Sequence, residues 1–248
     1  MFTRDLPVFL ILALLAEVLG TVGGFGSSVF FVPVANFYFD FQSVLGITAL
    51  FHLSSNITKI AFFRKGLDKR LVKYLGIPAV IFVSVGAFLS QFINPTILGL
   101  ILGVFLIGLS LVFLIFKKLV VKDSKKNAIT GGILSGLSAG LLGTGGAIRG
   151  ITMAAFKMDK ATFIATSAVI DFGVDASRAV IYYYNGYMHT EHLYLVAFLI
   201  GVAILGTWIG KRILAHFSQE QFRVFVLVLI LIIGAASVIS EMIKSNMC

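Results

Sequence analysis

The sequence predicts an all-α protein that crosses a membrane several times and is built from two copies of one unit. Three observations predict this class: a mean hydropathy of +1.01, a charged fraction of only 12%, and an internal similarity between the two halves of the chain. Soluble domains carry about 25% charged residues. So few charges among 248 residues cannot cover the surface of a water-soluble core, and we expect lipid to cover it instead.

Hydrophobic stretches close to the length of a membrane-spanning helix follow one another along the chain. A helix needs about 20 apolar residues to cross the hydrocarbon core of a bilayer. The first and fifth stretches are longer and rich in glycine, so we expect each to be a broken or re-entrant helix. The eight stretches run over approximately 6–39, 42–63, 71–91, 95–116, 128–158, 160–184, 192–213 and 221–241.

The two glycine-rich stretches open an internal repeat. With a shift of 119 residues, Gly24-Phe25-Gly26-Ser27-Ser28 aligns with Gly143-Thr144-Gly145-Gly146-Ala147. The same shift pairs Asp40 with Asp159 further along the chain. We therefore expect a first transmembrane repeat over 1–118 and a second over 119–248, which together form one integral membrane domain.

The basic residues favour one orientation of these repeats. If each broken segment crosses the membrane once, the copies are parallel and the Lys and Arg residues divide between both sides. If each is a hairpin, the copies are inverted, both termini lie on one side, and most basic residues lie on the other. Cytoplasmic loops are enriched in Lys and Arg, so we favour inverted repeats. The basic segments concerned are 64–73, 117–126, 157–160 and 211–223.

A break inside a membrane helix indicates a binding site, because unpaired backbone is tolerated there only when it is buried in protein or lines a cavity. The half-helix after each break would direct its free N–H groups and positive dipole end at a small anion, and hydroxyl groups could add donors. The alternative is that small residues merely let helices pack closely. The expected substrate-binding residues of the two breaks are Gly24, Gly26, Ser27, Ser28, Gly143, Thr144, Gly145 and Gly146.

A polar stripe follows each break at helical spacing, formed by Thr48, His52, Asn56 and Lys59 in the first repeat and by Ser167, Asp171, Asp175 and Arg178 in the second. Ionisable groups inside a membrane are costly and usually functional. We expect Asn56, Lys59 and Arg178 to contact the anion, and we expect a coupled proton to be carried by Glu17, His52, Asp171 or Asp175.

Three alternatives to these roles stay open. Lys59 is close to a helix end and could extend its ammonium group to the basic loop. Asp175 and Arg178 are three residues apart and could neutralise one another. Arg149, in the second broken segment, aligns with Phe30 and so gains no support from the repeat, although it could still be a cation of the site.

Other kinds of function find little support. The net charge of +9 lies in loops between apolar runs, which is typical of membrane topology and not of nucleic-acid binding. The segment His189-Thr190-Glu191-His192 lacks the His-Glu-x-x-His order, so we expect no metal, and we expect no cofactor and no enzymatic centre. The expected partners are a bilayer, of a bacterial inner membrane from the composition, and a small anion. We expect Tyr182–Tyr184 to face lipid or its interface.

These motifs give the chain a family resemblance over nearly its whole length. The two glycine-rich segments, the first followed by Pro33, resemble those of the TauE/SafE family of membrane transporters. The chain departs from the usual pattern at Ser27 and Ser28, which replace glycines, and at Thr152, where a proline often stands. The resemblance implies secondary transport of a small anion, sulfite or an organosulfonate such as sulfoacetate, by alternating access. A passive anion channel and a carrier for a non-sulfur anion are the alternatives.

Overall fold

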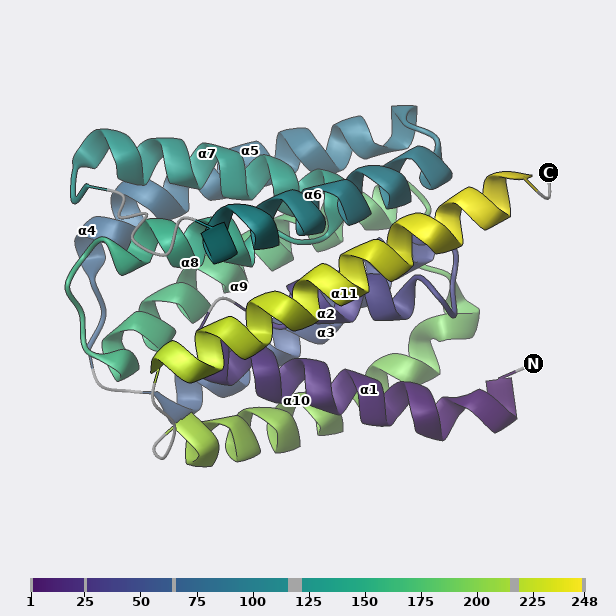
Figure 1. The fold of residues 1–248 in the computed structure, drawn as a ribbon, viewed down its shortest axis with the longest axis horizontal. Helices are drawn as coiled ribbons and strands as arrows, with labels where there is room; N and C mark the ends of the chain where they lie inside the picture. Colours follow the sequence, from purple (N-terminus) through teal and green to yellow (C-terminus); the bar gives the residue numbers. More distant parts are fainter. Residues whose placement is uncertain (1, 25, 64–65, 116–121, 215–218, 247–248) are drawn as a thin grey trace.

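The first half of the chain forms a broken helix followed by three long ones. The computed structural model describes residues 2–24, 26–63, 66–115, 122–214 and 219–246, and all elements in these ranges are helices (Figure 1). The predicted all-α membrane fold is thus confirmed at the level of class. The elements of this half are α1 Phe2–Gly23, α2 Ser28–Ala35, α3 Phe41–Phe62, α4 Lys69–Leu71, a π-helical turn Val72–Gly76, α5 Ile77–Leu89 and α6 Pro95–Ile115.

The second half shows the same order of elements. Its first hydrophobic stretch is again divided into a long and a short helix, and three long helices follow. The side chain of Asp40 caps α3 by accepting from the Ser43 N–H at 2.9 Å, and Asp159 caps α9 by accepting from the Thr162 N–H at 3.0 Å. The elements are α7 Lys125–Leu142, α8 Gly146–Ala154, α9 Lys160–Tyr184, a 3-10 turn Thr190–His192, α10 Leu193–Leu214 and α11 Gln219–Asn246.

Both broken segments are hairpins. In the first, α2 runs back along α1, so that the Phe9 ring near the start of α1 lies 5.9 Å from the Phe31 ring and 5.5 Å from the Phe39 ring. In the second, α8 runs back along α7, and a Cβ added at Gly131 would lie 2.2 Å from Oγ1 of Thr152. Neither segment therefore crosses the fold once from end to end.

Two helix pairs bring corresponding elements of the two halves together. Helices α3 and α9 are antiparallel, since Gly46 lies against Tyr187 while Asn56 bonds Asp175. Helices α6 and α11 are also antiparallel and pack closely through glycines, with Gly99 against Glu241. The first pair places α3 and α9, the helices whose sequences carry the polar stripes, beside each other in the middle of the molecule (Figure 1).

Two other large contacts each join a helix of the first half to a helix of the second half. Helix α1 runs parallel to α10, with Glu17 against Gly206, and α5 runs parallel to α7, with Ala79 against Gly136. Figure 1 also shows that α1 and α7, α5 and α10, and α6 and α11 run in opposite directions. Two inverted units would give these pairings; the division at residue 118 stays a prediction.

Four helices are long and apolar enough to cross a membrane among the residues that the structure describes, and large apolar side chains such as Val104 and Ile115 face outward from the bundle. Helices α3 and α9 carry the polar stripes and lie inside. The apolar outer surface is thus suited to contact lipid, while the polar groups lie in the centre of the bundle. The four spans are Asp5–Gly23, Lys69–Phe92, Pro95–Ile115 and Thr190–Leu214.

The described parts of the basic segments lie at one end of the molecule. Nζ of Lys211 donates to the Phe62 carbonyl at 2.7 Å, and Arg70 pairs with Asp123 at 3.5 Å. The start of α1 and the end of α11 lie at the opposite end (Figure 1). We call these the basic end and the terminal end. This is the arrangement that the hairpin topology and the enrichment of cytoplasmic loops in basic residues predict together.

Candidate functional site

The two backbone breaks meet in the centre of the molecule. Oγ1 of Thr144 in the second break donates to Oγ of Ser28 in the first at 3.2 Å. Gly24, Gly26 and Gly143 have φ angles of 74°, 88° and 75°, which residues with a side chain rarely adopt. Gly145 has a negative φ but lies so close to α7 that an added Cβ would be 2.0 Å from the Ser135 carbonyl oxygen. Glycine is therefore needed in each break for conformation or for space.

A buried cavity lies between the two breaks and the two polar stripes. It measures about 20 Å³ over the positions that the centre of a water molecule can take, which is room for about one water. Neither α2 nor α8 has its first N–H groups capped by the side chain of its N-cap residue in the described structure. The cavity is lined by Gly26, Ser27, Ser28, His52, Ser55, Asn56, Lys59, Ala139, Gly143, Gly145, Gly146, Arg149, Asp171, Val174, Asp175 and Arg178.

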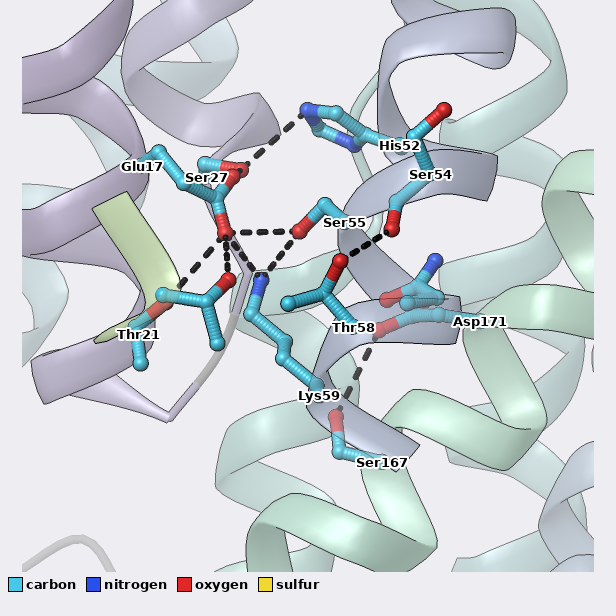
Figure 2. Close-up of polar contacts among 12 residues, drawn as sticks. Glu17, Thr21, Ser27, His52, Ser54, Ser55, Thr58, Lys59, Ser167 and Asp171 are labelled. Carbon is cyan, nitrogen blue, oxygen red and sulfur yellow. Dashed lines mark hydrogen bonds and ion pairs between the residues drawn. The ribbon is translucent and has the colours of Figure 1, made fainter. Parts of the chain in front are cut away.

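The first of three buried ion pairs joins α3 to α1. Nζ of Lys59 lies 2.8 Å from Oε1 of Glu17 and also donates to Oγ of Ser55 at 2.7 Å. Figure 2 shows hydroxyl groups converging on the same carboxylate, including those of Ser27 at 2.5 Å and Ser55 at 2.6 Å. Thr207 of α10 donates to it at 3.1 Å. Lys59 therefore points into the protein and does not extend to the basic loop.

The second ion pair joins α8 to α9. Nη1 and Nη2 of Arg149 contact the two carboxylate oxygens of Asp171, so the guanidinium holds the carboxylate at both oxygens. Nε of Arg149 donates to Oγ of Ser167 at 3.2 Å. The Arg149 side chain is 3% exposed and that of Asp171 15%. Sequence reasoning gave Arg149 no support from the repeat, yet the structure places its charge in the cavity wall.

The third ion pair lies within α9. Nη2 of Arg178 is 2.7 Å from Oδ1 of Asp175, while Nη1 donates to the carbonyls of Gly143 at 2.7 Å and Ala139 at 3.1 Å. Asn56 donates to the other oxygen of Asp175 at 2.7 Å. Arg178 thus neutralises Asp175 and also satisfies carbonyls at the end of α7. Its buried Nε has no partner among the described residues.

The predicted site residues divide into two layers. Most of them line the cavity: Gly26, Ser27, Ser28, Gly143, Gly145, Gly146, His52, Asn56, Lys59, Asp171, Asp175 and Arg178. Three others lie behind this layer: Gly24 is against Phe163, Thr144 bonds Ser28, and Glu17 contacts the lining residues Ser27, Ser55 and Lys59. Their roles in binding or proton transfer stay predictions.

The prediction that Tyr182 faces lipid or its interface is wrong. This residue was expected at the lipid interface with Tyr183 and Tyr184, but only those two are exposed, while Tyr182 is 0% exposed. Its hydroxyl donates to the Gly140 carbonyl at 2.7 Å. The signal that could have separated it is its position four residues after Arg178, on the inward stripe of α9. Ser55, Ser138 and Thr207 were missed as well, since single hydroxyl residues are common in apolar helices.

The site is electrically balanced as it stands. Lys59, Arg149 and Arg178 are each paired with one carboxylate, so three positive and three negative charges cancel. Burying a charge without a partner is expensive, and the pairing keeps all six groups tolerable away from water. The arrangement can therefore accept a further charged group only by opening a pair or by taking up a compensating charge.

Comparison with known proteins identifies one similarity. A family model described as Sulfite exporter TauE/SafE matches residues 9–237, which is most of the chain and includes both breaks and all three ion pairs. No curated protein and no solved structure matches the chain significantly.

Proposed function

The chain belongs to the TauE/SafE sulfite exporter family, and from this premise we propose that it is a secondary transporter of a small anion, sulfite or an organosulfonate, that works by alternating access. Membership makes it a membrane transporter. The substrate, the mechanism and the coupling are our proposal.

The observation that carries the proposal is the cavity between the two breaks. Three cations and two carboxylates line it, and the N-termini of α2 and α8 meet there, neither of them capped by the side chain of its N-cap residue in the described structure. Helix N-termini and guanidinium groups are the donors that small oxyanions accept in proteins. A site built from broken helices in the middle of a two-unit fold is typical of transporters that alternate between two open sides.

The charge balance supports coupling to protons. An anion that enters the neutral site alone leaves one negative charge without a partner, which is costly in a buried environment. A proton that enters with the anion restores the balance. Transport should therefore depend on a pH gradient.

Flux into liposomes that contain the purified protein tests this function. We expect saturable flux of sulfite, sulfate or sulfoacetate that a pH gradient drives. The flux should be lost in Arg178→Ala, because that variant leaves Asp175 unpaired and releases the carbonyls of Gly143 and Ala139. Lys160→Ala, at the exposed start of α9, is the matched control and should transport as the wild type does.

The outcomes separate the alternatives. Flux that does not saturate and ignores the gradient would indicate a passive channel. Saturable flux of another anion, with none of these three, would indicate a carrier for a non-sulfur anion. Normal flux in Arg178→Ala would remove Arg178 from the mechanism.

A further inference from the structure

The three buried ion pairs differ in how firmly their carboxylates are held. Glu17 accepts from Lys59 and from four hydroxyl groups, which belong to α1, α3, α10 and the first break. Opening this pair would disturb four segments at once. It also lies behind the cavity wall, so a ligand in the cavity cannot contact Glu17 without displacing Ser27, Ser55 or Lys59.

Arg178 is fixed in a different way. Its Nη1 satisfies two carbonyls at the end of α7, and its Nη2 holds Asp175. Moving this guanidinium would take a donor away from the Gly143 carbonyl, which costs free energy, while the Ala139 carbonyl would still accept from the Gly143 N–H and the Tyr182 hydroxyl. Arg178 is therefore suited to hold the second break in place and offers a ligand only its Nε.

Arg149 makes fewer hydrogen bonds outside its ion pair than Arg178 does, and as many as Lys59, which donates to Ser55. Apart from Asp171, the structure gives its guanidinium one bond, to the hydroxyl of Ser167. Asp171 is the most exposed of the three carboxylates, at 15% against 0% for Glu17 and 5% for Asp175. Separating this pair costs the fewest additional hydrogen bonds, and the released carboxylate is the one closest to water.

The position of Arg149 brings its charge close to both breaks. It belongs to α8, directly after the second break, and its Nη2 comes within 3.7 Å of the Cβ position of Gly26 in the first break. The guanidinium thus stands between the two breaks. Because the cavity has room for about one water, an anion of several atoms can bind only if a group that now fills the space moves.

Resting on the proposed function, we propose that Arg149 is the anion-binding residue and that the substrate takes the place of the Asp171 carboxylate on its guanidinium. The two Nη groups now contact two oxygens of one planar group. A ligand that replaces the carboxylate must offer the same pair of oxygens, which selects oxyanions such as sulfite, sulfonates or carboxylates over halides.

The exchange also identifies the group that would take up the coupled proton. When the pair opens, a proton from water adds to an oxygen of the displaced Asp171, and the site returns to three positive and three negative charges with a monovalent anion bound. The other charged or titratable groups of the cavity are His52 and Lys59 from α3 and Asp175 and Arg178 from α9. From the neighbouring α5 and its π-helical turn, Val80 lies against Gly173 and Gly76 against Ile170, and the turn also carries the titratable Tyr74, which packs against the apolar cluster that includes Ile170.

Binding and flux of methanesulfonate test the proposal, because this monovalent anion stays ionised and cannot itself carry the proton. Arg149→Lys keeps the charge but loses the two-pronged contact, and we expect its affinity in detergent to fall about tenfold or more. Asp171→Asn should still bind methanesulfonate but lose the dependence of flux on the pH gradient. Chloride should compete poorly with methanesulfonate on the wild type.

The exposed pair of Arg70 and Asp123 supplies the matched controls, because Arg70→Lys and Asp123→Asn make the same changes away from the cavity and should alter neither property. Proton uptake by the wild-type protein gives a measurement that needs no variant: about one proton per methanesulfonate bound supports the exchange, and none overturns it.

Unchanged affinity in Arg149→Lys, gradient-dependent flux in Asp171→Asn, or equal competition by chloride would overturn the proposal. Failure of the proposed function looks different, since the wild type would then show no saturable flux of any anion.

Discussion

Glu17 illustrates what a single buried carboxylate needs inside a membrane protein. Five donors surround it: one ammonium group and four hydroxyl groups (Figure 2). Each donor lowers the cost of keeping the charge away from water, and together they connect α1, α3, α10 and the first break. The residue thus connects segments that are distant in the sequence.

The contacts of Glu17 predict a large loss of stability when its ion pair is broken. Lys59→Ala removes the cation that the described part of the chain places beside Glu17, and breaking a buried pair typically costs about 3–5 kcal/mol. We expect the unfolding midpoint in detergent to fall accordingly. The double variant Glu17→Gln with Lys59→Ala should recover part of the loss, because no unpaired charge remains. Arg70→Ala breaks an exposed pair and should cost less than about 1 kcal/mol. A loss of stability no larger in Lys59→Ala than in Arg70→Ala would contradict the role of Glu17 in connecting these segments.

At the scale of elements, glycines do two different jobs in this fold. In the breaks they supply positive φ angles and close approach. On α7 they let α5 pack directly on the backbone: Cβ atoms added at Gly132, Gly136 and Gly140 would lie 2.3–2.4 Å from carbonyl oxygens of α5 or its π-helical turn. This second job is the small-residue packing considered as the alternative for the breaks. Glycine therefore serves conformation and close approach in the break and helix packing along α7, while the anion-binding role of the breaks stays a prediction.

Gly145→Ala tests whether the second break needs the close approach that glycine allows. The added Cβ would overlap the Ser135 carbonyl oxygen, so α8 must move away from α7 and carry Arg149 with it. We expect anion flux to fall at least about tenfold, the size of effect that a misplaced binding group produces, while the protein still inserts. Gly201→Ala in α10 is the matched control, since nothing lies within 4 Å of its Cβ position and alanine suits a helix interior. Equal flux in the two variants would show that the hairpin tip tolerates displacement.

At the scale of the whole molecule, the basic and terminal ends define the orientation in the membrane. The described basic segments are at one end, and the described ends of α1 and α11 are at the other (Figure 1). Lys and Arg are retained on the cytoplasmic side during insertion, so the terminal end should face outward.

Thiol labelling on intact cells measures this orientation directly. Cys248 lies outside the described residues but follows α11, and we expect a membrane-impermeant reagent to label it without permeabilisation. Lys125→Cys in a Cys248→Ser background reports the basic end, where α7 begins, and should react only after permeabilisation. The reverse pattern would invert the orientation, and labelling of both sites from one side would contradict the hairpin topology.

Local features of the sequence determined much of this fold. The positions of the breaks followed from glycine content and from stretches too long for one helix, because both are properties of neighbouring residues. The inward faces of α3 and α9 followed from spacing, since residues three and four apart share a side of a helix. Net charge and its placement in loops predicted the grouping of the basic segments at one end.

Only the tertiary structure decided which charges meet. Glu17 finds Lys59, and Arg149 finds Asp171, through contacts between helices whose register no local pattern records. The same packing buries Tyr182 while its neighbours Tyr183 and Tyr184 stay exposed. Hydropathy says that a helix is apolar enough for lipid, but which of its faces meets another helix depends on all the partners at once. The sequence therefore named most of the cavity's residues, and packing assigned their pairs.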